Sequence, residues 1–120
     1  MGSDFDDKQK KIDKENGDCL CSRFEEAFSI LGKKWNGVII EALLIGDSFR
    51  FGEIANKIDG CSDRILTARL KELRDCDIVS RKTFDESSLI KYELTEKGRD
   101  LQPIMKSVHV WADKWCDGNK

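Results

Sequence analysis

From residue 24 onward, apolar side chains recur at the three- and four-residue spacing of an amphipathic helix. The first such run predicts a helix that ends near Gly32, and its apolar positions are Phe24, Ala27, Phe28 and Leu31. Residues 35–44 are almost wholly apolar, which is typical of a helix at the centre of a fold. Residues 48–50 have room only for a very short strand before the next helical run, at 51–58.

The next signals predict two helices joined by a tight turn. The short helix at 51–58 closes at Asp59-Gly60, and Ser62 is well placed to cap a further helix over 62–76. The buried face of this second helix is marked by Leu66, Leu70 and Leu73. Two helices separated by a glycine-containing turn form the helix-turn-helix pattern.

After Asp77 the apolar period changes from helical to alternating. Two β-rich runs, 79–84 and 89–94, flank Asp-Glu-Ser-Ser, which predicts a hairpin with a four-residue loop. Thr95 then caps one long C-terminal helix. An apolar seam follows this helix over two heptads and consists of Leu101, Ile104, Val108, Trp111 and Trp115. The predicted fold class is therefore α+β, mainly α.

A helix-turn-helix followed directly by a hairpin suits duplex DNA for a geometric reason. The major groove admits one helix, and the hairpin beside it reaches neighbouring phosphates or the minor groove. The candidate base contacts are the short polar and basic side chains near the start of the second helix: Ser62, Asp63, Arg64 and Thr67. The candidate phosphate contacts are Arg69, Lys71, Arg81, Lys82 and Lys91. The alternative is that these charges only solvate an exposed helix.

Length and charge limit the number of domains and the location, but they do not decide whether the protein binds DNA. The 120 residues fit one domain at 19–120, preceded by a flexible charged arm at 1–18 that lacks apolar periodicity. A net charge of −2 argues against a DNA-binding protein, but the arm holds four Lys and six Asp/Glu, which leaves the remainder neutral. The chain has no apolar run of membrane-spanning length and no signal peptide, so we expect a cytoplasmic protein without membrane contact.

Four segments and one proline occur in order along the chain: LGKKW at 31–35, RFGEI at 50–54, GCSDRILTARLKEL at 60–73, YELTEKG at 92–98, and Pro103. Together they resemble the HxlR-type branch of winged helix-turn-helix transcriptional regulators, which is related to the MarR group. The resemblance covers about residues 20–115 in register. It implies a dimer built from the first and last helices, a recognition helix at 62–76, a wing at 79–95, and binding to palindromic promoter sites.

Three positions depart from the family pattern. The wing tip usually carries prolines and often a basic residue, whereas here it reads Asp85, Glu86, Ser87, Ser88, which leaves Lys82 and Lys91 as the better phosphate candidates. Asp77 stands at a usual helix-ending glycine, and aspartate still tolerates the left-handed conformation. Cys61 replaces a usual aliphatic residue just before the recognition helix.

The terminal helix carries more apolar surface than one small core uses. Beside its seam runs a second stripe of Met105, His109, Ala112 and Cys116. We therefore expect a homodimer, with an interface formed by Phe24, Phe28, Leu101, Ile104, Val108, Trp111 and Trp115. A fully intramolecular helix is the alternative.

Five irregularly spaced cysteines do not resemble a disulfide framework. Cys21 precedes the first helix beside Arg23, and a helix N-terminus and a cation both favour thiolate, so Cys21 is expected to be the most reactive. A cysteine at this place recurs in HxlR-type proteins that respond to oxidants or electrophiles. The redox hypothesis pairs an oxidised Cys21 with Cys61 or Cys116 of the other subunit. The alternative is that all five are reduced packing residues, with Cys76 structural.

Other function classes find less support in the sequence. Cys19-x-Cys21 lacks the spacing of structural zinc sites, so neither a metal nor a cofactor is expected. An enzyme is not expected, since a thiol redox enzyme normally shows CxxC and the chain has a single histidine. A winged-helix module that binds protein would expose aromatic residues over 62–74, where none occur. The predicted function is a homodimeric, sequence-specific DNA-binding regulator.

Overall fold

The computed structural model describes residues 21–118, and the chain divides into two units, 1–34 and 35–120. The first unit contains helix α1 (Ser22–Leu31), which confirms the helix predicted from apolar spacing. The Gly32 N–H donates a hydrogen bond of 2.8 Å to the Phe28 carbonyl and closes the last turn. The ring centroids of Phe24 and Phe28 lie 5.0 Å apart, so these two aromatic residues share one face. The arm predicted at 1–18 lies outside the described residues.

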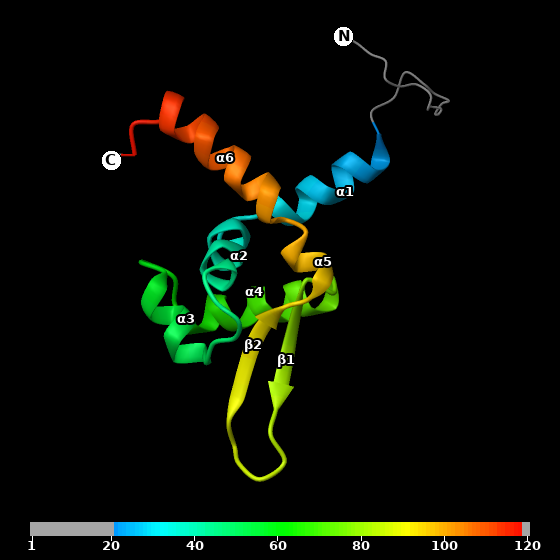
Figure 1. Cartoon of the computed structure of the whole chain (residues 1–120), viewed down its shortest axis with the longest axis vertical. Coiled ribbons are helices and arrows are strands. Elements are labelled where there is room, and N and C mark those ends of the chain that lie inside the picture. The colour runs from blue at the N-terminus through cyan, green and yellow to red at the C-terminus, as the bar shows by residue number, and fades with distance from the viewer. Residues whose placement is uncertain (1–20, 119–120) are drawn as a thin grey trace. The chain divides into compact units, whose positions relative to one another are not determined.

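Three helices supply most of the core of the second unit, and Ile78, Val79 and Leu94 of the following hairpin region complete it (Figure 1). Helix α2 (Asn36–Leu44) is the central helix that the apolar run predicted, and its residues Ile39 and Ile40 are fully buried. Helix α3 (Phe51–Lys57) adds Ile54, and helix α4 (Asp63–Asp75) adds three leucines. Burying an aliphatic side chain of this size contributes roughly 1.5–3 kcal/mol, so these residues supply much of the stability of the unit.

The turn between α3 and α4 sets the start of the predicted recognition helix. Gly60 has φ +82, a left-handed conformation that glycine adopts without steric cost. The Ser62 hydroxyl accepts a hydrogen bond of 3.2 Å from the Ile65 N–H, which confirms Ser62 as the N-cap. After the helix ends, Asp77 has φ 63 and occupies the left-handed position where a glycine is more usual.

Strands β1 (Val79–Thr83) and β2 (Ile90–Leu94) form the predicted antiparallel hairpin, which we call the wing. Each strand is one residue shorter than predicted, and the loop spans 84–89 instead of four residues. The Ser87 hydroxyl accepts a 3.0 Å hydrogen bond from the Leu89 N–H, a local turn that replaces strand pairing there. The short strand predicted at 48–50 is a single bridge, in which Phe49 and Tyr92 exchange backbone hydrogen bonds of 2.8 and 2.7 Å.

The predicted long C-terminal helix is present, but it begins later than Thr95, because two helices follow the wing. Helix α5 (Glu96–Arg99) begins at Thr95, whose hydroxyl accepts a 3.0 Å hydrogen bond from the Gly98 N–H, and helix α6 spans Gln102–Trp115. In a continuous helix Pro103 would offer no N–H to the Arg99 carbonyl and its ring would clash there, so the helix restarts with Pro103 in its first turn. Among residues 21–118, no helix has the length and apolar character needed to cross a membrane.

Candidate nucleic-acid interface and reactive cysteines

The outer side of the first turns of α4 carries the predicted base contacts. Asp63, Arg64 and Thr67 are all exposed, on the side of the helix away from the buried leucines. Within residues 21–118, Arg64 forms no ion pair, so its guanidinium is available for a bidentate contact with guanine. The Thr67 hydroxyl donates a 2.8 Å hydrogen bond to the Asp63 carbonyl and keeps its acceptor capacity. Ser62 is also exposed, but its hydroxyl already caps the helix.

Two predicted phosphate contacts on α4 already have carboxylate partners. The Arg69 guanidinium lies 3.2 Å from Glu72, and its side chain is only 22% exposed. The Lys71 ammonium lies 3.3 Å from Asp75, and both of these side chains are well exposed. Arg69 therefore borders the core face and is less accessible than the sequence suggested, whereas Lys71 stays at the surface.

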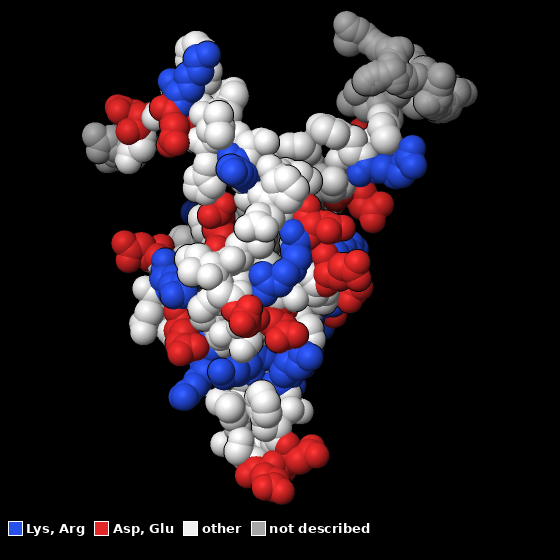
Figure 2. All heavy atoms as spheres, in the orientation of Figure 1, with Lys and Arg blue, Asp and Glu red and all other residues white. Residues whose placement is uncertain are grey.

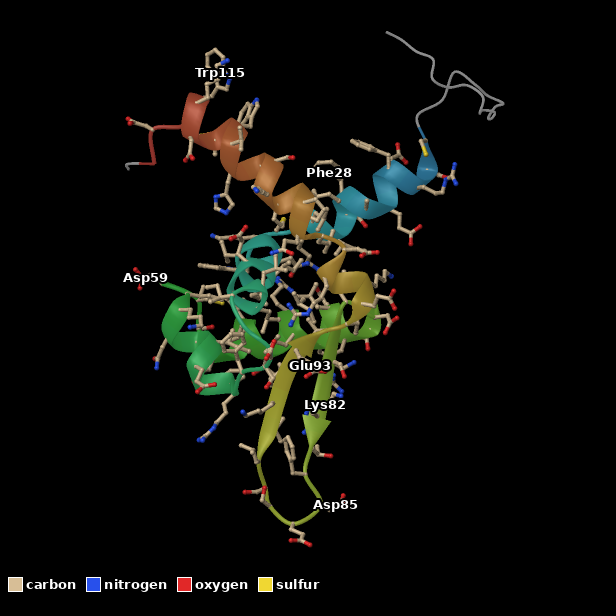
Figure 3. All side chains as sticks on the ribbon, in the orientation of Figure 1. Phe28, Asp59, Lys82, Asp85, Glu93 and Trp115 are labelled. Atoms are coloured by element: carbon tan, nitrogen blue, oxygen red, sulfur yellow. The ribbon has the colours of Figure 1, made fainter. Side chains whose placement is uncertain are left out.

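The wing brings the remaining cations to its two faces. Lys82 lies directly opposite Lys91, whereas Arg81 lies opposite Tyr92 on the other face, which also carries buried Val79 and Leu94. Figure 3 shows Lys82 between the body of the unit and the wing tip, at the level where basic side chains gather in Figure 2. The Lys82 ammonium lies 3.3 Å from a carboxylate oxygen of Glu93.

The tip of the wing is acidic. Asp85 and Glu86 are exposed in the loop, and the tip appears as a red cluster beyond an uncharged band in Figure 2. Carboxylates at this place repel DNA phosphates. Lys82 and Lys91, which lie opposite each other nearer the body of the unit, are therefore better placed for phosphate contacts than the tip, as the departure from the family pattern suggested.

Helix α6 exposes most of its predicted apolar seam. It has no buried residue, and Ile104, Val108, Trp111 and Trp115 are 48%, 56%, 61% and 66% exposed. An open apolar groove of about 500 Å³ runs along this helix, lined by Pro103, Ile104, Ser107, Val108 and Trp111. Leu101, the first seam residue, is half-buried where α5 meets α6. An exposed apolar patch of this kind is typical of a protein interface.

The second stripe of α6 faces α2. His109 Nε2 lies 2.8 Å from Glu41 Oε2, and Met105 and Ala112 on the same stripe are half-buried. The hydrogen bond with Glu41 and the negative charge of its carboxylate raise the pKa of His109, and Asp113 adds a smaller effect. His109 is an exposed residue that links α6 to the central helix.

Cys21 has the environment that the sequence predicted. It is exposed at the N-cap of α1, where the nearby backbone N–H groups of Phe24 and Arg23, and then the Arg23 guanidinium, favour the thiolate and lower the pKa of its thiol. Cys61 is half-buried just before the Ser62 cap, and Cys116 is exposed at the end of α6. Residues 21–118 contain no cluster of three metal-binding side chains. Cys19 lies outside these described residues.

Two carboxylates escaped the sequence-based reasoning. Glu93 contacts Lys82 across the hairpin. The strand register predicts this contact, because diagonal neighbours on one sheet face come within reach of long side chains. Glu41 lies 68 residues from His109, and no local pattern points to that contact.

Comparison with known proteins identifies related regulators. A model of the HxlR-like helix-turn-helix family matches residues 30–120. The HTH-type transcriptional regulator YodB of Bacillus subtilis is 43% identical over 102 residues, which cover 84% of this chain and 90% of YodB. The solved structure of reduced YodB superposes on this chain with a TM-score of 0.73 at 42% sequence identity, covering 85% of this chain and 100% of that one. The quinone-bound structure of YodB gives a TM-score of 0.70 at 43% identity, covering 79% of this chain and 100% of that one. The reduced redox regulator HypR gives 0.72 at 30% identity, covering 79% and 94%.

Proposed function

The chain belongs to the HxlR-like helix-turn-helix family and is a DNA-binding transcriptional regulator, and from this premise we propose that it reads a palindromic duplex site as a homodimer. The observation that carries the proposal is the exposed polar start of α4, next in the chain to a wing that presents Lys82 and Lys91 together. Arg64, at this start of α4, has no ion-pair partner among residues 21–118. Helix α4 would enter the major groove while the two lysines contact phosphates beside it. A regulator of this kind acts on the chromosome, so we propose a cytoplasmic location.

The exposed seam of α6 supports the homodimer. A twofold interface uses the same patch on both subunits, and a helix face with an apolar groove and two exposed tryptophans offers such a self-complementary patch. We propose that α6 pairs with its counterpart, and that Phe24 and Phe28 of α1 also contact the partner subunit. Twofold symmetry would then present two α4 helices one helical turn of DNA apart.

The test of DNA reading uses fragments selected from random duplex DNA by the purified protein, followed by titration of variants. We expect Arg64→Ala to reduce the preference for a selected fragment over random duplex by about 1–3 kcal/mol. Lys91→Ala should weaken both by the same factor, because phosphate contacts carry no sequence information. Failure of the wild type to bind any duplex at low salt would overturn the regulator's proposed mode of action.

We also propose that Cys21 makes the regulator redox-responsive. The support is the lowered pKa and exposure of its thiol, together with relatives that are called redox regulators or were captured with quinone. A peroxide would oxidise the thiolate to sulfenic acid with loss of hydroxide. A second thiol, from Cys61 or Cys116 of the partner subunit, would then displace water to form a disulfide.

The redox proposal is tested by DNA affinity before and after mild peroxide treatment. We expect treated wild type to change affinity and Cys21→Ser protein to stay unchanged, with Cys76→Ser behaving as wild type because Cys76 caps the end of α4 half-buried. Non-reducing gels of Cys61→Ser and Cys116→Ser identify the second thiol. An equal peroxide response in Cys21→Ser would overturn the proposal.

We propose no catalytic role, and the two other function classes have specific tests. A thiol redox enzyme would reduce a disulfide substrate with turnover, whereas a sensor reacts once per thiol. A winged-helix module that binds protein would need an apolar outer face on α4, but that face carries Asp63, Arg64 and Thr67. Ile65, at 37%, is the one large apolar residue exposed on α4, whereas α6 exposes five.

A further inference from the structure

The outer face of the wing presents two lysines and a glutamate together. The antiparallel register places Ser80 opposite Glu93, and Lys82 opposite Lys91, so these four side chains leave the same side of the hairpin. This side is opposite to the one that buries Val79 and Leu94. The three charged residues sum to +1, although the wing is proposed to meet a polyanion.

The two lysines of this face are not equivalent. The Lys82 ammonium lies 3.3 Å from Glu93, in a pair whose side chains are 52% and 32% exposed (Figure 3). No carboxylate within residues 21–118 forms an ion pair with Lys91. One cation is therefore available to a phosphate, while the other must first leave its carboxylate.

We propose that Glu93 is a positioning residue that competes with DNA phosphate for Lys82 and so lowers the sequence-independent affinity of the wing. The inference rests on the proposed function, because it requires the wing lysines to face DNA. Glu93 contacts no DNA in this scheme and acts only through Lys82.

The opposed lysines give the competition a structural reason. Like charges directly opposite on two strands destabilise a hairpin, and Glu93 relieves this repulsion by neutralising one of them. When DNA approaches, phosphate replaces Glu93 as the partner of Lys82, and the released carboxylate stays near the polyanion. The wing of the free protein therefore stays ordered. Its affinity for DNA of arbitrary sequence is lower than it would be if both lysines lacked a carboxylate partner.

The test measures binding of Glu93→Gln protein to a random-sequence duplex across a salt series. We expect binding about two- to fivefold tighter than wild type at about 0.1 M salt, the range for removing an exposed ion pair. The slope of log K against log salt should steepen by up to about 0.9, the value for one more neutralised phosphate. Glu93→Asp, which keeps the charge but shortens the side chain, should fall between the two.

Glu86→Gln is the matched control. It makes the same chemical change and the same change of net charge on the same hairpin, but Glu86 has no ion pair with any residue from 21 to 118. We expect less than a twofold effect from it, because it lowers the repulsion of phosphates at the tip but frees no cation to bind them. In a Lys82→Ala background, Glu93→Gln should lose its advantage and match Glu86→Gln, because the effect passes through the Lys82 ammonium.

The outcomes separate the two proposals. If Glu93→Gln equals Glu86→Gln, or keeps its full effect without Lys82, the role of Glu93 is wrong. The proposed wing contact would still stand in that case, provided Lys91→Ala weakens binding. If wild type ignores duplex DNA, the proposed function fails and this inference fails with it. Thermal unfolding of each variant checks that the hairpin remains folded.

Discussion

Helices α4 and α6 carry apolar residues at the same helical spacing, yet only α4 buries them. Leu66, Leu70 and Leu73 of α4 are at most 1% exposed, whereas Val108 and Trp111 of α6 are more than half exposed. Amphipathic spacing thus identifies a face that needs a partner, but not whether the partner lies in the same chain. The apolar face of α4 is covered by the core of the second unit. We propose that the apolar face of α6 is covered by a second subunit.

The sharpest test of this difference compares truncations on the two helices. Leu70→Ala should lower the free energy of unfolding by about 2–5 kcal/mol at any protein concentration, because it leaves a cavity inside one chain. Val108→Ala should lower it only where the protein is dimeric, and its effect should shrink on dilution. Urea unfolding followed by circular dichroism at several protein concentrations measures both. A concentration-independent loss for Val108→Ala would place its partner within the chain.

Next in size is the effect of a tryptophan at the groove of α6. Trp111→Ala should weaken dimerisation by about 2 kcal/mol or more, close to thirtyfold in the dissociation constant, as expected for a central aromatic anchor. Val110→Ala is the matched control, since Val110 is 64% exposed on the same helix but lies off the seam. Sedimentation equilibrium separates the two. Equal losses would mean that the seam is not the interface, and a monomeric wild type would refute the dimer.

Sequence reasoning succeeded where the physics is local. Helical spacing, the Ser62 cap and the change of period after Asp77 predicted α1 to α4 and the wing within about two residues. It failed at the junction of α5 and α6, where the steric demand of Pro103 broke an apolar pattern that continues across the break. The ion pairs of Glu93 and Glu41 also went unseen, because side-chain partners depend on register and on packing between distant segments.

A smaller effect on stability is expected at the start of α4, where the change removes a capping hydrogen bond rather than a buried side chain. Ser62→Ala should lower the free energy of unfolding by about 1 kcal/mol, because the Ile65 N–H loses its acceptor. Ser88→Ala, at an exposed wing position, should change it by less than about 0.5 kcal/mol. Thermal or urea unfolding without DNA keeps this effect apart from any base contact of Ser62. An unchanged midpoint for Ser62→Ala would show that the cap contributes no stability.

The smallest effect concerns the exposed link between α6 and the core, His109 with Glu41. Because Glu41 raises the pKa of His109, the stability from this pair is fully present below the ordinary histidine pKa of about 6.5 and is lost as the pH rises through the folded value. His109 is the single histidine, so its ring proton resonances in an NMR titration are unambiguous. Glu41→Gln should lower the pKa of His109 towards the ordinary value. Glu86→Gln, at the wing tip, should leave it unchanged, and an equal shift in both variants would mean that overall charge, rather than the 2.8 Å contact, sets the titration.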